Sequence, residues 1–325
     1  MKRVLVSGAS GIVGYGILRS LRQSGRECLL VGTSIHDDSV APAFCDVFEL
    51  APPTRAPEYL DWLLATLRRL RIDLLIPGIE VDLYHWADHA EEIRATGALP
   101  LLNTPELIAL CKDKWAFYER LAQAGLACAI ETSLEPDFAV LAGRFGLPFL
   151  LKPRRGFGSR GLARVASEAD FEPHRPEVGP VLMAQPIVGD DAEEFTVSAF
   201  CDGQGRRFAE MALRRKLSPE GFTQWAEVVD PAEFGPAMDD LCRLLHPLGP
   251  TNFQFRRAAD GPRLLEINPR ISSATSIRAA FGYNESAMAL DYFLDRRVPV
   301  QPAIRGGRAV RYTEEKIFHE GGVHR

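Results

Sequence analysis

Lys152 ends an apolar run that begins at Phe149, and a loop with glycines at positions 156, 158 and 161 follows it. A lysine at the end of a buried strand is costly unless an anion meets its charge. Glycines let neighbouring backbone amides turn toward one point, which forms a nest for phosphate oxygens. This segment therefore predicts a phosphate site. The alternative is a β-hairpin with a glycine-rich turn and a lysine whose ammonium group reaches solvent.

Two alternating segments within residues 251–268 predict a β-hairpin. If its strands pair symmetrically about the central turn, Gln254 lies opposite Glu266 and Asn252 lies opposite Asn268. Glu266 and Asn268 are two residues apart on one strand, so their side chains share a face. One carboxylate and carboxamide oxygens at this separation suit Mg²⁺ that also binds phosphates. The alternative is a polar solvent face, because a slip of one residue would separate these side chains.

The segment from Gly8 to Gly14 follows a predicted strand and opens a predicted helix, which is the context of a dinucleotide fingerprint. An NAD site normally has an acid at the end of the second strand, but here Val31 is followed by glycine, threonine and serine. A Tyr-x-x-x-Lys pair, Tyr312 and Lys316, lies near the C-terminus rather than within a domain. We therefore expect glycines that allow a tight turn. An NAD(P)-dependent short-chain-type oxidoreductase is the alternative.

Two kinds of scaffold must position these residues. Strand and helix patterns alternate up to about residue 105, which predicts a parallel sheet with helices on both faces. Asn103 to Glu106 has the signature of a helix start, with Pro105 at the first helical position, and marks the first boundary. Beyond residue 124, short strands joined by glycine loops predict antiparallel pairing. The expected fold class is α/β followed by α+β.

The composition narrows the classes of function. The 325 residues include 46% hydrophobic and 25% charged side chains, as in a globular protein, and the formal charge is −5. Since no basic stripe or long apolar stretch occurs, we expect no nucleic acid or membrane partner. The six scattered cysteines indicate reduced thiols, hence a cytoplasmic protein. Only six of the 38 basic residues are lysine, so each lysine is a candidate for a role that arginine cannot fill.

Taken in order, the motifs resemble those of the ATP-grasp superfamily, and in particular the group similar to the large subunit of carbamoyl phosphate synthase. The resemblance runs from the N-terminus to about residue 298. Its marks are Asp113-Lys114, Lys152 with the glycine loop, Gln185-Pro186-Ile187, Glu194-Phe195-Thr196-Val197, Gln254, and Glu266-Ile267-Asn268-Pro269-Arg270.

The resemblance implies a role for each motif. ATP phosphates would contact Lys114 and Lys152, beneath a loop that contains Gly156, Gly158, Ser159 and Gly161. The backbone of Gln185, Pro186 and Ile187 would hold adenine, and Glu194, with Glu193 as its rival, would bond the ribose. Mg²⁺ would bind Gln254, Glu266 and Asn268. Arg270 would face the transferred phosphate or the substrate carboxylate. Lys216 would approach the γ-phosphate or belong to a solvated charge run.

The resemblance also implies an organisation and an activity. A Rossmann-like pre-ATP-grasp domain would span residues 1–105, the N-terminal ATP-grasp subdomain 106–185 and the C-terminal subdomain, with the Mg²⁺ site, 186–325. The expected enzyme is an ATP-dependent carboxylate-amine or amino acid ligase that forms an acyl phosphate and releases ADP and phosphate. Its partners would be a small-molecule carboxylate and amine, and a homodimer stays open. A non-catalytic ATP-binding module is the other alternative.

Overall fold

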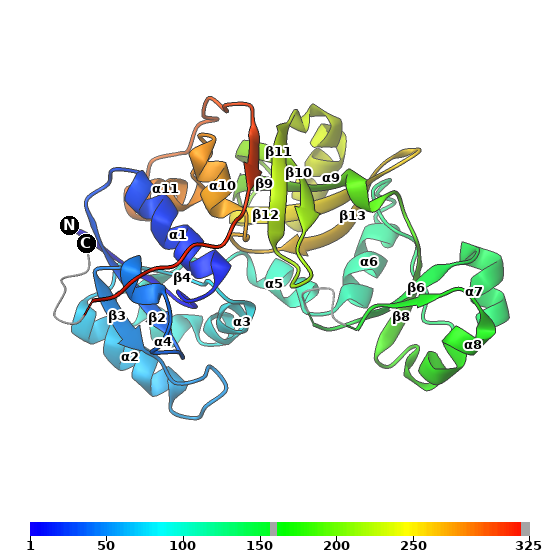
Figure 1. The fold of residues 1–325 in the computed structure, drawn as a ribbon, viewed down its shortest axis with the longest axis horizontal. Helices are drawn as coiled ribbons and strands as arrows, with labels where there is room; N and C mark the ends of the chain where they lie inside the picture. Colours follow the sequence, from blue (N-terminus) through cyan, green and yellow to red (C-terminus); the bar gives the residue numbers. More distant parts are fainter. Residues whose placement is uncertain (157–160, 320–325) are drawn as a thin grey trace.

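A parallel five-stranded sheet forms the N-terminal part of the chain, for which the computed structural model describes residues 1–156 and 161–319 (Figure 1). The strand order is β3-β2-β1-β4-β5, and every neighbouring pair is parallel. Its elements are β1 Lys2–Val6, α1 Ile12–Gln23, β2 Cys28–Ser34, β3 Val47–Leu50, α2 Tyr59–Leu70, β4 Leu74–Ile76, α3 Glu80–Asp88, α4 Ala90–Arg94 and β5 Leu99–Pro100. The expected α/β half is confirmed. The chain leaves β1 toward β2 and β3 and then returns to β4, so a crevice opens at the carboxyl end of β1.

The glycines of the first turn are required by the packing of the turn itself. Gly8 has φ +58°, in the left-handed region. A Cβ on Gly14 would lie 2.2 Å from the Gly8 carbonyl oxygen, and a Cβ on Gly78 would lie 2.0 Å from the Ser7 carbonyl oxygen. The close approach of β1, α1 and the end of β4 therefore accounts for these glycines without a dinucleotide.

A small antiparallel sheet with the order β7-β6-β8 forms the lobe at the right of Figure 1. The buried rings of Phe149 and Phe171 lie in its core, beside Leu141 and Val165. The elements of this part are α5 Pro105–Cys111, α6 Lys114–Gln123, α7 Phe138–Phe145, β6 Phe149–Pro153, β7 Ala163–Val165, α8 Glu168–Phe171 and β8 Leu182–Pro186.

A six-stranded antiparallel sheet with the order β13-β12-β9-β10-β11-β14 lies between the two. Its elements are β9 Glu194–Asp202, β10 Arg207–Leu217, β11 Thr223–Val229, α9 Gly235–Leu245, β12 Leu248–Ala258, β13 Gly261–Asn268, α10 Thr275–Ala280, α11 Glu285–Ala289 and β14 Arg308–Val310. The expected antiparallel half is confirmed, whereas β3, β5, β11 and β14 were not anticipated. α3 and α4 are separate helices that meet at His89.

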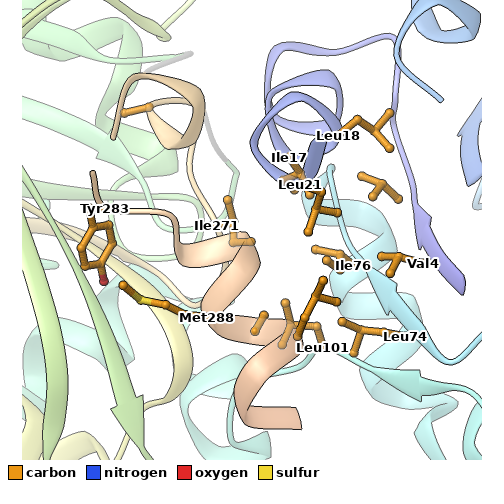
Figure 2. Packing of buried hydrophobic residues seen from close by; sticks show 14 of the residues in the cluster. Val4, Ile17, Leu18, Leu21, Leu74, Ile76, Leu101, Ile271, Tyr283 and Met288 are labelled. Atoms are coloured by element: carbon orange, nitrogen blue, oxygen red, sulfur yellow. The ribbon is translucent and has the colours of Figure 1, made fainter. Parts of the chain in front are cut away.

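One hydrophobic core joins the N-terminal sheet to the last helices of the chain (Figure 2). Ile17 and Leu21 of α1 and Ile76 of β4 belong to the same buried cluster as Ile271 and Met288. This shared core places the carboxyl edge of the parallel sheet beside the segment that follows β13. The domain boundaries at residues 105 and 185 stay predictions. Across the described residues, no helix combines the length and the apolar character needed to cross a bilayer.

Candidate active site

Lys152 lies near the end of β6, with its ammonium group directed at the neighbouring hairpin. Lys152 Nζ donates to the Leu265 carbonyl oxygen at 3.2 Å and to the Tyr118 hydroxyl at 3.4 Å. Leu265 is the extra residue of a β-bulge in β13, because Gln254 pairs with Glu266 while Phe255 pairs with Leu264. The bulge provides the carbonyl group that Lys152 and Tyr118 share. Burial lowers the pKa of Lys152, and the negative charge of Glu266 opposes that effect.

Lys114 begins α6 and approaches the same space from another direction. Its Nζ donates to the Gly156 carbonyl oxygen, at the start of the glycine loop. Burial lowers the pKa of Lys114, and Glu266 again opposes the change. Asp113 caps the helix through the Trp115 amide at 3.0 Å and pairs with Arg154 at 2.9 Å. This cap fixes where Lys114 leaves the backbone, so both lysines bring positive charge close to Glu266.

The segment expected to hold adenine runs from the end of β8 into the following loop. Gln185 is buried, and its Nε2 donates to the Thr132 hydroxyl at 2.9 Å. Gln185, Pro186 and Val188 line a cavity, whereas the side chain of Ile187 is 38% exposed and does not line it. The contact expected of Gln185, Pro186 and Ile187 is a backbone contact, and it stays a prediction. Val188 is a lining side chain that the motif did not include.

Glu194 is the buried member of the acidic pair that the sequence left open. Its Oε1 accepts from Arg215 at 2.9 Å, and its Oε2 accepts from Arg256 at 3.1 Å. Glu193 points elsewhere and pairs with Arg257. Arg215, which sequence reasoning missed, is 3% exposed and also donates to Gln254 Oε1 at 2.8 Å. Strand alternation on β10 buries Arg215 and therefore exposes its neighbour.

That neighbour is Lys216. Its side chain is exposed, and its Nζ lies 5.8 Å from the centroid of the Trp225 ring. It lines a shallow hollow beside Arg256 and not the cavity of Lys152. The structure therefore does not bring Lys216 together with Lys114 and Lys152, and the geometry favours the solvated alternative.

The predicted hairpin register is confirmed where it matters for the site. β12 and β13 pair Asn252 with Asn268 and Gln254 with Glu266. The turn is shorter than expected, with Ala259 and Asp260 at its tip. The extra residue at the Leu265 bulge compensates for the shorter turn, so the pairs Gln254–Glu266 and Asn252–Asn268 keep the expected register.

The hairpin offers a cation the carboxylate of Glu266 and the amide oxygens of Gln254 and Asn268. Gln254 Oε1 already accepts from Arg215, and Asn268 Oδ1 accepts from Arg270 at 3.3 Å. Within 1–156 and 161–319, no group donates a hydrogen bond to the Glu266 carboxylate. In the same part of the chain, no three His, Cys, Asp or Glu side chains lie close enough together to form a metal cluster. One carboxylate beside amide oxygens fits an Mg²⁺ that takes most of its ligands from phosphates and water.

Arg270 links the hairpin to the N-terminal sheet. Its Nη1 donates to the Ile271 carbonyl oxygen at 2.9 Å, and its Nη2 lies 3.4 Å from Glu80 Oε2 at the start of α3. Glu80 also accepts from the Tyr84 hydroxyl at 2.7 Å. Arg270 Nε is buried and has no hydrogen-bond partner in the part of the chain that the structure describes. The guanidinium thus has hydrogen-bonding capacity left for a ligand.

Two cavities meet at Gln254 and Glu266. The first, which we call the lysine cavity, has a volume of about 140 Å³ and includes Lys114, Lys152, Gly156, Gln185, Pro186, Val188, Glu194, Gln254 and Glu266. The second, which we call the arginine cavity, has a volume of about 450 Å³ and includes Ile12, Val13, Glu80, Arg215, Gln254, Glu266, Asn268, Arg270, Ser272 and Ser273. Gly161 has φ +75° and lies against Pro153, while Gly158 and Ser159 lie outside the described residues.

Comparisons with known proteins agree with this arrangement. A family model described as "ATP-grasp in the biosynthetic pathway with Ter operon" matches residues 180–316. The carbamoyl phosphate synthase large chain of Kineococcus radiotolerans is 29% identical over 189 residues, which cover 54% of this chain and 17% of that protein. The C-terminal section of the same enzyme in Methanocaldococcus jannaschii is 28% identical over 302 residues, 83% of this chain and 47% of that protein.

Solved structures add the fold. The N5-carboxyaminoimidazole synthetase of Staphylococcus aureus, complexed with ADP, matches with a TM-score of 0.73 and 14% identity, over 93% of this chain and 80% of that one. The parallel sheet and the two antiparallel sheets give the chain an ATP-grasp fold. Residues 180–316 match an ATP-grasp family model, and the chain is distantly similar to the carbamoyl phosphate synthase large chain. It spans less than half the length of these curated relatives.

Proposed function

We propose that this chain is an ATP-dependent ligase that joins a carboxylate to an amine or an amino acid, through an acyl phosphate, with release of ADP and phosphate. The observation that carries the proposal is the meeting of the two cavities at Gln254 and Glu266. A nucleotide in the lysine cavity and an acid in the arginine cavity would share this boundary, where a phosphoryl group could pass between them.

The lysine cavity would hold Mg-ATP. Adenine would lie at the hinge of Gln185 and Pro186, and the ribose would lie near Glu194. Lys114 and Lys152 would contact the phosphates, which would replace the carbonyl groups that now accept from both ammonium groups. Glu266, with the amide oxygens of Gln254 and Asn268, would hold Mg²⁺. When bound, the metal neutralises phosphate charge and orients the phosphoryl group.

The chain's own residues would prepare the acid for reaction. A free carboxylate is a poor acyl donor because oxide is its leaving group, whereas an acyl phosphate releases phosphate when an amine attacks. Arg270 would orient the substrate carboxylate and offset charge as the phosphoryl group arrives, and Lys152 would do so from the other side. No covalent intermediate on the protein is needed. Positioning and electrostatics would supply the rate enhancement.

The arginine cavity would accept the carboxylate substrate. Beside Arg270 it offers the hydroxyls of Ser272 and Ser273 and the first turn of α1, where the Ile12 and Val13 amides begin a helix. The free amides at a helix start favour negative charge. Glu80 would keep the Arg270 guanidinium in place and could also meet the incoming amine.

The oxidoreductase alternative has less support. Tyr312 is 78% exposed, and Tyr312 to Lys316 lie in an irregular segment after β14 rather than on a helix. The glycine turn is accounted for by its own packing.

The test is an assay of nucleotide products with pooled carboxylic acids and pooled amines. The proposal expects ADP release that needs both pools. AMP and pyrophosphate as products would contradict the ligase mechanism. ATP binding without substrate-dependent turnover would favour a non-catalytic ATP-binding module, and oxidation of NADPH would favour the oxidoreductase.

A further inference from the structure

A third cavity opens at the carboxyl edge of the parallel sheet, and the proposed ligase reaction does not use it. We call it the strand-end cavity. Its volume is about 340 Å³. Its walls come from the ends of four strands and include Gly8, Ser10, Gly11, Thr33, Ser34, His36, Thr54, Arg55, Tyr59, Ile79, Val81 and Asp82.

Among the described residues, none lines both the strand-end cavity and the lysine cavity. In the same part of the chain, Ile79 and Val81 are the residues that the strand-end cavity shares with the arginine cavity. These two side chains flank Glu80, which belongs to the arginine cavity, while Asp82 belongs to the strand-end cavity. The first turn of α3 therefore divides the two spaces, and a ligand in one need not occupy the other.

The inner wall carries a buried acid in a network of hydroxyl groups. Asp82 is 3% exposed, and its Oδ1 accepts from the Thr54 hydroxyl at 2.6 Å and from the Tyr59 hydroxyl at 3.0 Å. Burial raises the pKa of Asp82, and hydroxyl donors oppose that rise. A carboxylate can accept more than these bonds, so Asp82 has capacity left for a donor on a ligand. A buried acid of this kind in a cavity is typical of a binding site.

The rim carries positive charge and the start of a helix. The side chains of His36 and Arg55 are exposed and line the opening. Gly11, the N-cap of α1, also lines the opening, whereas Ile12 and Val13, the first residues of the helix, line the arginine cavity. Ser10 lies beside this turn, with its hydroxyl 2.9 Å from that of Ser34. The rim cations favour a negatively charged group on a ligand, while the Asp82 carboxylate in the interior can accept hydrogen bonds from it.

We propose that the strand-end cavity binds a small organic anion, a carboxylate or a phosphate monoester, whose other groups donate hydrogen bonds to Ser10, Ser34 and Asp82. The anionic group lies toward Arg55 and His36. The apolar body of the ligand packs against Ile79, Val81 and the two prolines that follow β3, Pro52 and Pro53. The proposal does not depend on the ligase reaction, because it concerns binding alone.

The test is calorimetric titration of the full chain saturated with Mg-ADP, which under the proposed function occupies the lysine cavity. One arm uses ribose 5-phosphate and AMP, and the other uses L-serine and L-malate. We expect one compound or more to bind at one site, with at least a fivefold loss of affinity in Arg55→Ala. Arg68→Ala is the matched control, since Arg68 is an exposed arginine of α2 outside the cavity, and it should change affinity less than twofold.

A second variant, Asp82→Asn, tests the inner wall without removing volume and should weaken binding of the same compound. The proposal is overturned if no compound binds in either arm. It is also overturned if the affinity is the same in Arg55→Ala, or if binding is lost in Arg270→Met instead, since that result would assign the compound to the arginine cavity.

Discussion

Arg215 of β10 donates a hydrogen bond to Gln254 of β12, across the intervening strand β9. The same guanidinium also donates to the Glu194 carboxylate. One buried cation thus joins the acid expected at the ribose to the amide expected at the metal. Its position on β10 places it between the lysine and arginine cavities, where it lines the second. The positive charge of Arg215 therefore lies beside a hairpin that contributes one carboxylate, Glu266, to the site.

Substituting Arg215 should therefore affect both stability and nucleotide binding. In Arg215→Met, Glu194 keeps the half-buried Arg256 as a partner, and Gln254 loses the donor that Arg215 provides. We expect a loss of about 3 kcal/mol in the free energy of unfolding and at least a tenfold rise in KM for ATP. Urea denaturation and initial rates measure the two.

Arg214→Met is the matched control for that experiment. Arg214 is the preceding residue on β10, and its partly exposed side chain pairs with Glu227 at 2.6 Å. Its loss should cost less than about 1 kcal/mol and leave KM for ATP unchanged. Equal effects in the two variants would show that the buried cation has no special role.

The same substitution, lysine to methionine, at Lys152 and at Lys216 tests which of the two contributes to the phosphate site. Lys152→Met removes the buried ammonium that faces Glu266 and should lower kcat/KM by at least about 100-fold, while thermal denaturation shows a folded protein. Lys216→Met removes an exposed ammonium beside Trp225 and should change kcat/KM less than threefold. A large effect at Lys216 alone would reverse the two assignments.

The hairpin could be predicted because its signal is local. The two strands alternate around a short turn, so pairing Gln254 with Glu266 needs no knowledge of distant residues. The choice between Arg215 and Lys216 could not be made in this way. Their order on the strand is clear from the sequence, but which face is buried depends on sheet neighbours far along the chain, including Glu194 and Gln254.

The shared core could not be predicted for the same reason. α1 approaches α10 closely enough that a Cβ on Gly16 would lie 3.1 Å from Thr275 Cγ2. Nothing near Gly16 in the sequence indicates a partner some 260 residues later. The edge strand β14 was missed because it has only three residues, Arg308–Val310, and pairs with β11 through tertiary contacts rather than a turn.

Acid should remove a stabilising contribution of Asp113. Burial opposes ionisation, but the hydrogen bonds and charge of Arg154 lower the pKa of Asp113 below its ordinary value of 3.8. The ionised form is thus favoured in the folded state, so the stabilisation is present above about pH 4 and is lost as the pH falls through the lowered pKa. Asp113→Asn, which keeps the helix cap, should cost about 1 kcal/mol at pH 7.

The difference between wild type and Asp113→Asn should be constant from pH 7 to pH 5 and shrink below pH 4, as measured by urea denaturation. Asp137→Asn is the control, because Asp137 caps α7 through Val140 and its substitution leaves Arg154 untouched. A difference that grows toward low pH would contradict the assignment.

The glycine turn offers a test of its structural role. Gly14→Ala would place a Cβ 2.2 Å from the Gly8 carbonyl oxygen, so we expect a loss of more than about 3 kcal/mol in stability. Gly143→Ala, in α7, has no atom within 4 Å of the new Cβ and should stabilise the protein by about 0.5–1 kcal/mol. A Gly14→Ala protein as stable as wild type would contradict the packing role of this glycine.

The acyl phosphate is the centre of the proposed reaction, and isotope transfer tests it most directly. The acid pool is labelled with ¹⁸O in its carboxylate groups, and the released inorganic phosphate is analysed by mass spectrometry after turnover with ATP and the amine pool. Phosphorylation of the acid, followed by attack of the amine, leaves one substrate oxygen on each phosphate, so we predict phosphate that carries a single ¹⁸O. Unlabelled phosphate formed at the same rate as ADP would contradict the mechanism.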